Sequence, residues 1–297
     1  MKPVILDLIG NTPLLDISFL ALSPDITLFA KAEWMNPGGS LKDRPVKRML
    51  TKAIESGELT KDKTIIDSSS GNAGIAYSMI GNALDFQVQI VIPGNASIER
   101  KERMKAHGTS IIETDPIEGY DEALRHVHKL VDTDPDKYFL CDQYANDNNW
   151  LSHYHGTAEE IIEQADGEIH YFVGGVGTGG SITGIGRRLK EVYPNVKIYG
   201  VRPEVWPGIE GLKPLGSPED IVPKIFDETV VDDWIYITAD EAKHWCSKVA
   251  KNGLFVGQSS GSYLAACAKL MEKIDSGKIV TLFNDFGDRY FSAGLWS

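Results

Sequence analysis

Short β-branched runs alternate with longer amphipathic stretches along most of this 297-residue chain, and this alternation constrains the fold more than any other feature. The runs predicted as strands are TIID (64–67), VQIVIP (88–93), SIIET (110–114), KYFLC (137–141), HYFVGG (170–175), VKIYGVRP (196–203), VVDDWIYIT (230–238), LFVG (254–257) and KIVTLFND (278–285). Helical patterns lie at 97–108, 120–132, 156–167, 238–253 and 260–274. Several of them end in glycine, where a left-handed cap costs least. The alternation predicts a parallel sheet with helices on both faces.

Two segments without regular periodicity mark the domain organisation. The length fits two domains, or one large α/β domain with an additional lobe. The polar stretch YANDNNWLSHYHG (144–156) suits a crossing between two lobes. Prolines and glycines interrupt residues 204–229, and a loop of this length inside a compact domain is usually functional or mobile.

The charge and the cysteines exclude several classes of protein. The net charge of −12 argues against a nucleic-acid surface, which needs clustered lysine and arginine, and against an anionic membrane. Cys141, Cys246 and Cys267 cannot all pair and form no CxxC motif, so we expect structural thiols in a reducing cytosol. The first residues resemble neither a signal peptide nor a membrane span, and no later apolar run is long enough to span a bilayer. We therefore expect a cytoplasmic protein.

Lys42 lies in the stretch NPGGSLKDRP (36–45), just after two glycines and a serine. Pro45 has no N–H and fits only the first turn of a helix, so a helix is expected to begin near Asp43. Lys42 would then project from a strand-like segment at a helix entrance. A lysine of this kind is usually a surface cation when it stands alone, so its interpretation depends on the neighbouring loops.

Three further loops join a predicted strand to a predicted helix, where open α/β sheets bind their ligands. DSSSGNAG (67–74) offers hydroxyls, an amide and backbone N–H groups at a helix start, which suit a carboxylate. The alternative is a helix capped by one serine. VGQSSGSYLAA (256–266) raises the same alternative, with Ser259 or Ser260 as the capping residue.

The third loop, GGVGTGGSITG (174–184), predicts a phosphate site. Its glycines let backbone N–H groups approach an anion at a helix N-terminus, and Thr178 and Ser181 add hydroxyl donors. The loop also satisfies GxGxxG, so an NAD-dependent oxidoreductase is an alternative. NAD is the weaker interpretation, because the loop lies past mid-chain and the next strand runs into Arg202 and Pro203 before an acid.

Together these motifs resemble the fold-type II pyridoxal-phosphate enzymes of the cysteine synthase and cystathionine β-synthase family. The resemblance runs from IGNTPLL through FAKAEWMNPGGSLKDR, SSSGNAG, GGVGTGGSITG and VGQSSGS to GDRY, and it is closest to the bacterial B-type cysteine synthases. It implies a tryptophan-synthase-β-like α/β fold of two lobes, each with a central, mostly parallel sheet flanked by helices. It also implies a smaller, substrate-closing domain of residues 40–145 and a larger cofactor-phosphate domain of residues 1–39 and 146–297.

The resemblance implies pyridoxal 5′-phosphate as the cofactor and assigns its contacts. Lys42 would form the Schiff base and later take the substrate Cα proton as general base. Asn72 would hydrogen-bond the pyridine 3′-oxygen. Ser259 would face the pyridine nitrogen and leave it essentially neutral. The cofactor phosphate would be held by Gly177, Thr178, Gly179, Gly180 and Ser181.

The resemblance assigns the substrate α-carboxylate to Ser69, Ser70, Gly71 and Gln143. The chain departs from the family in this loop, where Ala73 replaces a usual threonine and Asp67-Ser68-Ser69 replaces Glu-Pro-Thr. These departures leave the choice of amino acid open. Lys213 falls near the position where some relatives carry an arginine that selects O-phosphoserine, and a solvated surface lysine is the alternative.

The implied activity is a β-replacement that makes L-cysteine from an activated serine and sulfide through an α-aminoacrylate. O-acetylserine is the usual first substrate in the family, and O-phosphoserine is the alternative. A rival activity uses serine or cysteine and gives cystathionine, lanthionine or hydrogen sulfide. The resemblance also implies a homodimer. No metal site is expected, because the seven histidines show no metal-ligand spacing.

Overall fold

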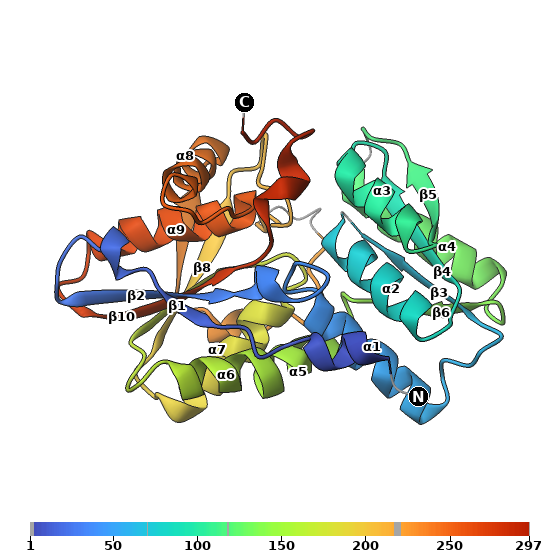
Figure 1. Ribbon diagram of the computed structural model, residues 1–297, viewed down its shortest axis with the longest axis horizontal. Helices are drawn as coiled ribbons and strands as arrows, with labels where there is room; N and C mark the ends of the chain where they lie inside the picture. Colours follow the sequence, from blue (N-terminus) through green and yellow to red (C-terminus); the bar gives the residue numbers. More distant parts are fainter. Residues whose placement is uncertain (1–2, 70, 118, 217–220, 297) are drawn as a thin grey trace.

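The computed structural model describes residues 3–69, 71–117, 119–216 and 221–296, and it contains two sheets (Figure 1). The six-stranded sheet has the order β1-β2-β10-β7-β8-β9, and the four-stranded sheet has the order β5-β4-β3-β6. The strands are β1 (Leu14–Asp16), β2 (Ile26–Ala32), β3 (Thr64–Ser68), β4 (Val88–Pro93), β5 (Ser110–Thr114), β6 (Tyr138–Leu140), β7 (Tyr171–Gly175), β8 (Lys197–Pro203), β9 (Asp233–Ile237) and β10 (Gly277–Phe283). These strands pair in parallel except for β1 with β2. The α/β prediction with two mostly parallel sheets is confirmed.

Helices flank both sheets, and each stretch predicted as helical overlaps one. They are α1 (Asp43–Ser56), α2 (Asn72–Ala83), α3 (Ile98–Ala106), α4 (Gly119–Thr133), α5 (Asn148–Ser152), α6 (Ala158–Gln164), α7 (Gly180–Val192), α8 (Ala239–Ala250) and α9 (Gln258–Met271). Between α5 and α6, residues His153–Thr157 form the π-helix η4, and Glu33–Met35 form the 3-10 helix η3. Figure 1 shows α8 and α9 on one face of the six-stranded sheet and α5, α6 and α7 on the other. Among the described helices, none has the length and apolar character needed to cross a membrane.

Each sheet has its own hydrophobic core, because parallel strands are covered on both faces and bury nearly continuous apolar runs. Phe172, Ile198 and Phe283 belong to the core of the six-stranded sheet. Ile65 and Ile90 belong to a separate core of the four-stranded sheet. All three cysteines are free and buried, as expected for structural thiols.

Helix α1 connects the two halves of the molecule. Its residues Val46, Met49 and Leu50 lie in the core of the four-stranded sheet. Arg44, in its first turn, is bound instead to Glu33 at the end of β2. The helix that follows Lys42 is therefore attached to both lobes. The division into domains of 40–145 and of 1–39 with 146–297 stays a prediction.

Three expectations about the elements are corrected by the structure. LFVG (254–257) is not a strand, since only Val256 makes an isolated bridge to Phe286. Strand β2 was not predicted, because its Lys31 looks solvent-exposed in the sequence but is fully buried beside an acid. Residues 144–156 are not irregular but contain α5 and part of η4. Polar residues of that segment, such as Asn149, are buried, which hides the helical pattern.

Candidate active site

Residues from both lobes line a cavity of about 180 Å³. Its lining residues are Lys42, Ser69, Asn72, Ala73, Tyr120, Gln143, Tyr144, Gly177, Thr178, Gly211, Leu212 and Lys213. A smaller recess of about 50 Å³ shares Lys42, Asn72, Gly177 and Thr178 with this cavity, and it adds Ser181 and Ser259. The structure thus brings most of the predicted site residues together. Gly71, Gly179 and Gly180 lie in the same loops but do not line these two spaces, and Ser70 lies outside the described residues.

Lys42 immediately precedes α1, which begins at Asp43 as predicted. The expectation of a strand-like segment is wrong, because Lys42 has helical backbone angles and follows a turn in which Gly39 has a φ of 75°. Leu41 N–H donates to the Asn284 carbonyl at 2.8 Å and fixes this turn against the end of β10. Burial lowers the pKa of the Lys42 amine to about 8, although the negative charge of Asp67 partly opposes this shift. A lysine with such a pKa has an appreciable neutral, nucleophilic fraction near neutral pH.

The Ser69 hydroxyl in the serine loop supports the start of α2 and also lines the cavity. The Ser69 hydroxyl accepts hydrogen bonds from Gly71 N–H at 2.9 Å and Gly74 N–H at 2.8 Å, so this serine supports the first turn of α2. Its own proton can still be donated into the cavity that it lines. Gln143, which follows β6 next to β3, is held by its Nε2 donating to the Ser68 carbonyl at 2.8 Å.

A buried acid, Asp67, holds this loop through three hydrogen bonds. It accepts hydrogen bonds from the Tyr77 hydroxyl at 2.5 Å, from Ser68 N–H at 2.8 Å and from Gln143 N–H at 3.3 Å. Burial raises the pKa of Asp67 to about 7, against the lowering effect of these hydrogen bonds. The Asp67 carboxyl therefore links its own strand, β3, to Tyr77 in α2 and to Gln143 after β6.

Asn72 is oriented by residues from the far end of the chain. Its Nδ2 donates to Asp285 Oδ2 at 2.7 Å, and Arg289 Nη1 donates to its Oδ1 at 2.5 Å. Tyr290 donates to the same Asp285 oxygen at 2.6 Å. Asp285 was not singled out from the sequence. The GDRY motif, which contains Arg289 and Tyr290, was the available signal.

The glycine loop ends at the N-terminus of α7, as an anion site requires. Gly177 packs so closely on the Gly211 carbonyl that an added Cβ would lie 2.5 Å from its oxygen, and Gly179 has a φ of 81°. Thr178 is almost fully buried, and its hydroxyl accepts from Asn149 Nδ2 at 3.1 Å. Glycine at 177 and 179 permits this packing and this backbone turn, and the N-terminus of α7 together with the Thr178 hydroxyl fits a phosphate.

Ser259 lies in the first turn of α9 but does not cap it. The N-cap is Gly257, with no side-chain cap, so the capping interpretation is wrong for Ser259. Its hydroxyl accepts from Asn284 Nδ2 at 3.0 Å. Asn284 Oδ1 is buried and has no hydrogen-bond partner among the described residues. A recess with a serine hydroxyl and an unsatisfied polar atom fits the polar ring of a pyridoxal cofactor.

The acid that follows strand β8, Glu204, does not support the NAD alternative. Glu204, which follows β8, accepts the Ala239 N–H with its side chain. This bond satisfies a donor at the start of α8. The acid expected to hold a ribose is therefore engaged elsewhere.

Lys213 lines the cavity and is not a solvated surface lysine. Its side chain is 16% exposed, and its Nζ lies 3.1 Å from Asp121 Oδ1 and 5.3 Å from the centre of the Tyr144 ring. Tyr144 stacks on Tyr120 at 5.6 Å. Neither tyrosine was predicted, because nothing in the local sequence separates them from core aromatics.

One charged contact beside the recess crosses between the lobes and was also missed. Arg100 of α3 is 2% exposed and pairs with Glu210, which lies in the long loop after β8. Its guanidinium lies 4.7 Å from the centre of the Tyr290 ring. Residues 210–213 of the segment expected to be functional or mobile (204–229) thus line one side of the site.

Comparisons with known proteins match the whole chain. The family model described as pyridoxal-phosphate dependent enzyme matches residues 5–285. A cysteine synthase of Aquifex aeolicus is 44% identical, covering 100% of this chain and 93% of the relative. Cysteine synthase B of Pseudomonas aeruginosa is 37% identical, covering 99% and 97%. The crystal structure of an O-acetylserine dependent cystathionine β-synthase from Helicobacter pylori superposes with a TM-score of 0.90 at 31% identity, covering 100% and 99%.

Proposed function

The chain belongs to the pyridoxal-phosphate dependent enzyme family, in its cysteine synthase branch, and on that premise we propose that it makes L-cysteine from an activated serine and sulfide. The observation that carries the proposal is the meeting of Lys42, Asn72, Ser259 and the glycine loop around one connected space. When bound, pyridoxal phosphate supplies an aldehyde and an electron-withdrawing ring that stabilises negative charge at the substrate Cα.

Lys42 is proposed to hold the cofactor and then to move a proton. Its amine has a pKa of about 8 because it is buried, so it can act as a nucleophile and later accept the Cα proton of the substrate. The same amine, once protonated, can assist departure of the group at Cβ. The cofactor phosphate is proposed to bind Gly177, Thr178, Gly179, Gly180 and Ser181.

Two side chains are proposed to set the tilt and the electronics of the ring. Asn72 would hydrogen-bond the 3′-oxygen, and its amide is already oriented by Asp285 and Arg289. Ser259 would offer a hydroxyl, and no carboxylate, to the ring nitrogen. A hydroxyl does not keep that nitrogen protonated, which favours loss of a β-substituent over transamination.

The substrate carboxylate is proposed to bind the loop of Ser69, Ser70 and Gly71 together with Gln143. Ser69 can donate its hydroxyl proton, and Gln143 lines the same cavity. Closing this loop over the carboxylate would exclude water from the reacting Cβ.

For the leaving group, we propose acetate rather than phosphate. Lys213 is the cation placed to receive a phosphate, but its charge is neutralised by Asp121 at 3.1 Å. A neutral ion pair attracts a phosphate dianion far less than a free ammonium does. O-acetylserine is therefore the proposed first substrate, and O-phosphoserine is the alternative.

A second candidate function uses an amino-acid thiol in place of sulfide, or cysteine in place of the activated serine. Its products would be cystathionine, lanthionine or hydrogen sulfide. The supporting observation is the group of Tyr120, Tyr144 and Lys213 at one end of the cavity, since sulfide alone needs no such polar wall. The similarity to the Helicobacter pylori cystathionine β-synthase points the same way.

A cytoplasmic homodimer is part of the proposal. The free, buried cysteines support a reducing compartment. The dimer rests on the family resemblance and is tested by light scattering of the purified protein, for which a monomeric mass would contradict it.

The test is a kinetic comparison of O-acetylserine, O-phosphoserine, serine and cysteine as first substrates, each with sulfide and with homocysteine. We expect kcat/KM to be highest for O-acetylserine with sulfide. Faster turnover of cysteine, or of homocysteine as acceptor, would establish the second candidate. A colourless protein that binds NAD would refute both.

A further inference from the structure

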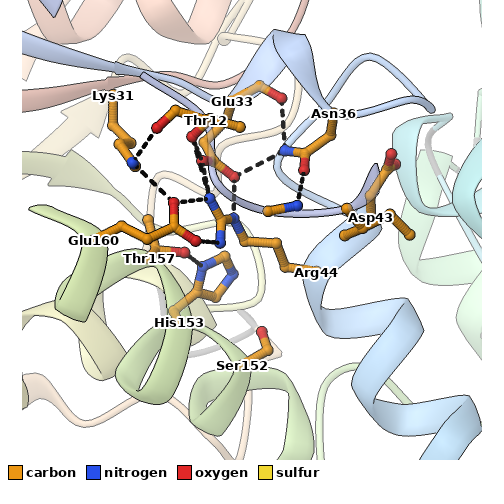
Figure 2. A network of polar contacts seen from close by, with 12 residues as sticks. Thr12, Lys31, Glu33, Asn36, Asp43, Arg44, Ser152, His153, Thr157 and Glu160 are labelled. Carbon is orange, nitrogen blue, oxygen red and sulfur yellow. Dashed lines mark hydrogen bonds and ion pairs between the residues drawn. The ribbon is translucent and has the colours of Figure 1, made fainter. Parts of the chain in front are cut away.

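A buried network of charged and polar side chains lies at the start of α1 (Figure 2). At its centre is Arg44, two residues after Lys42 and 6% exposed. Its Nε and Nη2 donate to the two carboxylate oxygens of Glu33 at 2.7 and 2.8 Å. Its Nη1 and Nη2 donate to the two oxygens of Glu160 at 2.6 and 2.7 Å. A guanidinium bound by two bidentate carboxylates has one fixed position.

The charges of this network balance. Lys31 is fully buried and lies 2.8 Å from Glu160, so two cations face two carboxylates. Burial alone would raise the pKa of Glu160, but Arg44 and Lys31 lower it to about 2. Burial, together with the charges of Arg44 and Lys42, lowers the pKa of His153, so this neighbour remains neutral. Removing one charged member would leave an uncompensated buried charge.

Glu33 binds both ends of the segment that carries Lys42. Its Oε2 accepts from Asn36 Nδ2 at 3.0 Å and from Arg44 Nε at 2.7 Å, while its Oε1 accepts from the Thr12 hydroxyl at 2.7 Å. Residues 36 and 44 bracket the turn before α1 (Figure 2). One buried carboxylate at the end of β2 therefore closes this segment into a loop.

Helix α1 contacts both lobes, so any movement of one lobe against the other would act on it. Its middle, including Met49 and Leu50, packs in the core of the four-stranded sheet. The glycine loop, by contrast, follows β7 of the six-stranded sheet. Movement of one lobe against the other would displace Lys42 from the glycine loop unless the start of α1 stayed with the six-stranded sheet.

We propose that Glu33 and Glu160, acting through Arg44, are positioning residues that keep Lys42 in register with the glycine loop while the rest of α1 follows the other lobe. The proposal rests on the proposed role of Lys42 in holding the cofactor. It assigns to these carboxylates a role in geometry and none in proton transfer.

The test uses the double variant Lys31→Met/Glu33→Gln in the full chain, with and without cofactor. The variant removes one positive and one negative charge, so the remaining charge of Arg44 is still balanced by Glu160. The new amide can accept with only one of its two ends, so in either orientation the bidentate contact between residue 33 and Arg44 is reduced to one bond. We expect hydrogen–deuterium exchange of a peptide covering 36–44 to accelerate at least tenfold, while exchange in β10 stays unchanged. We expect kcat to fall at least tenfold with KM changed less than threefold.

The matched control is Glu159→Gln, one residue from Glu160 on the same helix. Its side chain is 44% exposed and pairs with Arg188, so neither exchange nor kcat should change. If the double variant does not fold, Asn36→Ala removes an uncharged side chain that bonds Glu33 and the Gly10 N–H, and it should accelerate exchange over 36–44 at least threefold.

Three outcomes would overturn the proposal. The first is unchanged exchange over 36–44 in whichever variant folds. The second is unchanged kcat in a double variant that exchanges faster. The third is faster exchange spread evenly over the chain, which would assign the network to general stability. Failure of the proposed function would look different, because Lys42→Ala would then retain its activity while exchange over 36–44 still depended on Glu33.

Discussion

The reactivity of Lys42 toward an aldehyde should follow the ionisation of a buried amine. Burial lowers its pKa from 10.5 to about 8. At pH 7 a pKa of 8 leaves about 9% of the amine neutral, whereas a pKa of 10.5 leaves about 0.03%. The buried position therefore raises the reactive fraction about 300-fold, and this factor is what the assay has to detect.

The assay mixes cofactor-free protein with pyridoxal phosphate at fixed concentration between pH 6 and pH 10 and follows the absorbance change. The rate should rise about tenfold per pH unit below pH 8 and level off above it. Asp67→Asn removes the charge that favours the protonated amine, so the midpoint should move to lower pH. Lys42→Ala is the control and should show no fast phase. A rate that keeps rising to pH 10 would refute the account of a desolvated amine.

Three further predictions follow from single contacts. Tyr77→Phe removes the 2.5 Å donor to buried Asp67 and should lower the free energy of unfolding by about 1–3 kcal/mol in urea titrations, where a loss below about 0.5 kcal/mol would contradict it. Asp121→Asn frees the ammonium of Lys213 and should lower KM for O-phosphoserine about tenfold without changing KM for O-acetylserine, so an equal response of both substrates would speak against it. Burial raises the pKa of Asp43 to about 7, so between pH 4 and pH 7 the folded carboxyl keeps a proton that the unfolded one has released, and the free energy of unfolding falls as the pH rises. Asp43→Asn should flatten this decline in the urea midpoints, and an unchanged slope would contradict the prediction.

The parts of the site that lie within one short glycine- or serine-containing motif could be predicted from the sequence. Lys42, Asn72, Thr178 and Ser259 each follow a glycine- or serine-containing motif whose backbone requirements are local. Asn72 follows β3 of the four-stranded sheet and Thr178 follows β7 of the six-stranded sheet, so loops at the carboxyl ends of strands from both sheets meet at the cavity. The structure places these four residues around connected spaces.

The parts that depend on distant partners could not be predicted. Asn72 and Asp285 are 213 residues apart in the chain, and nothing local indicates that one orients the other. Strand β2 was missed for a related reason. Lys31 and Glu33 are charged, but both are buried because Glu160 and Arg44 balance them. A charge pattern alone cannot distinguish such a buried pair from a solvated face.

The central claim is that Lys42 carries the pyridoxal cofactor, and reduction with borohydride followed by peptide mass mapping tests it most directly. We predict that the purified protein is yellow, that reduction bleaches it, and that the reduced cofactor is found on one peptide, the one that contains Lys42. Recovery of the label on another lysine, or of no label from a protein that turns over O-acetylserine, would contradict the account.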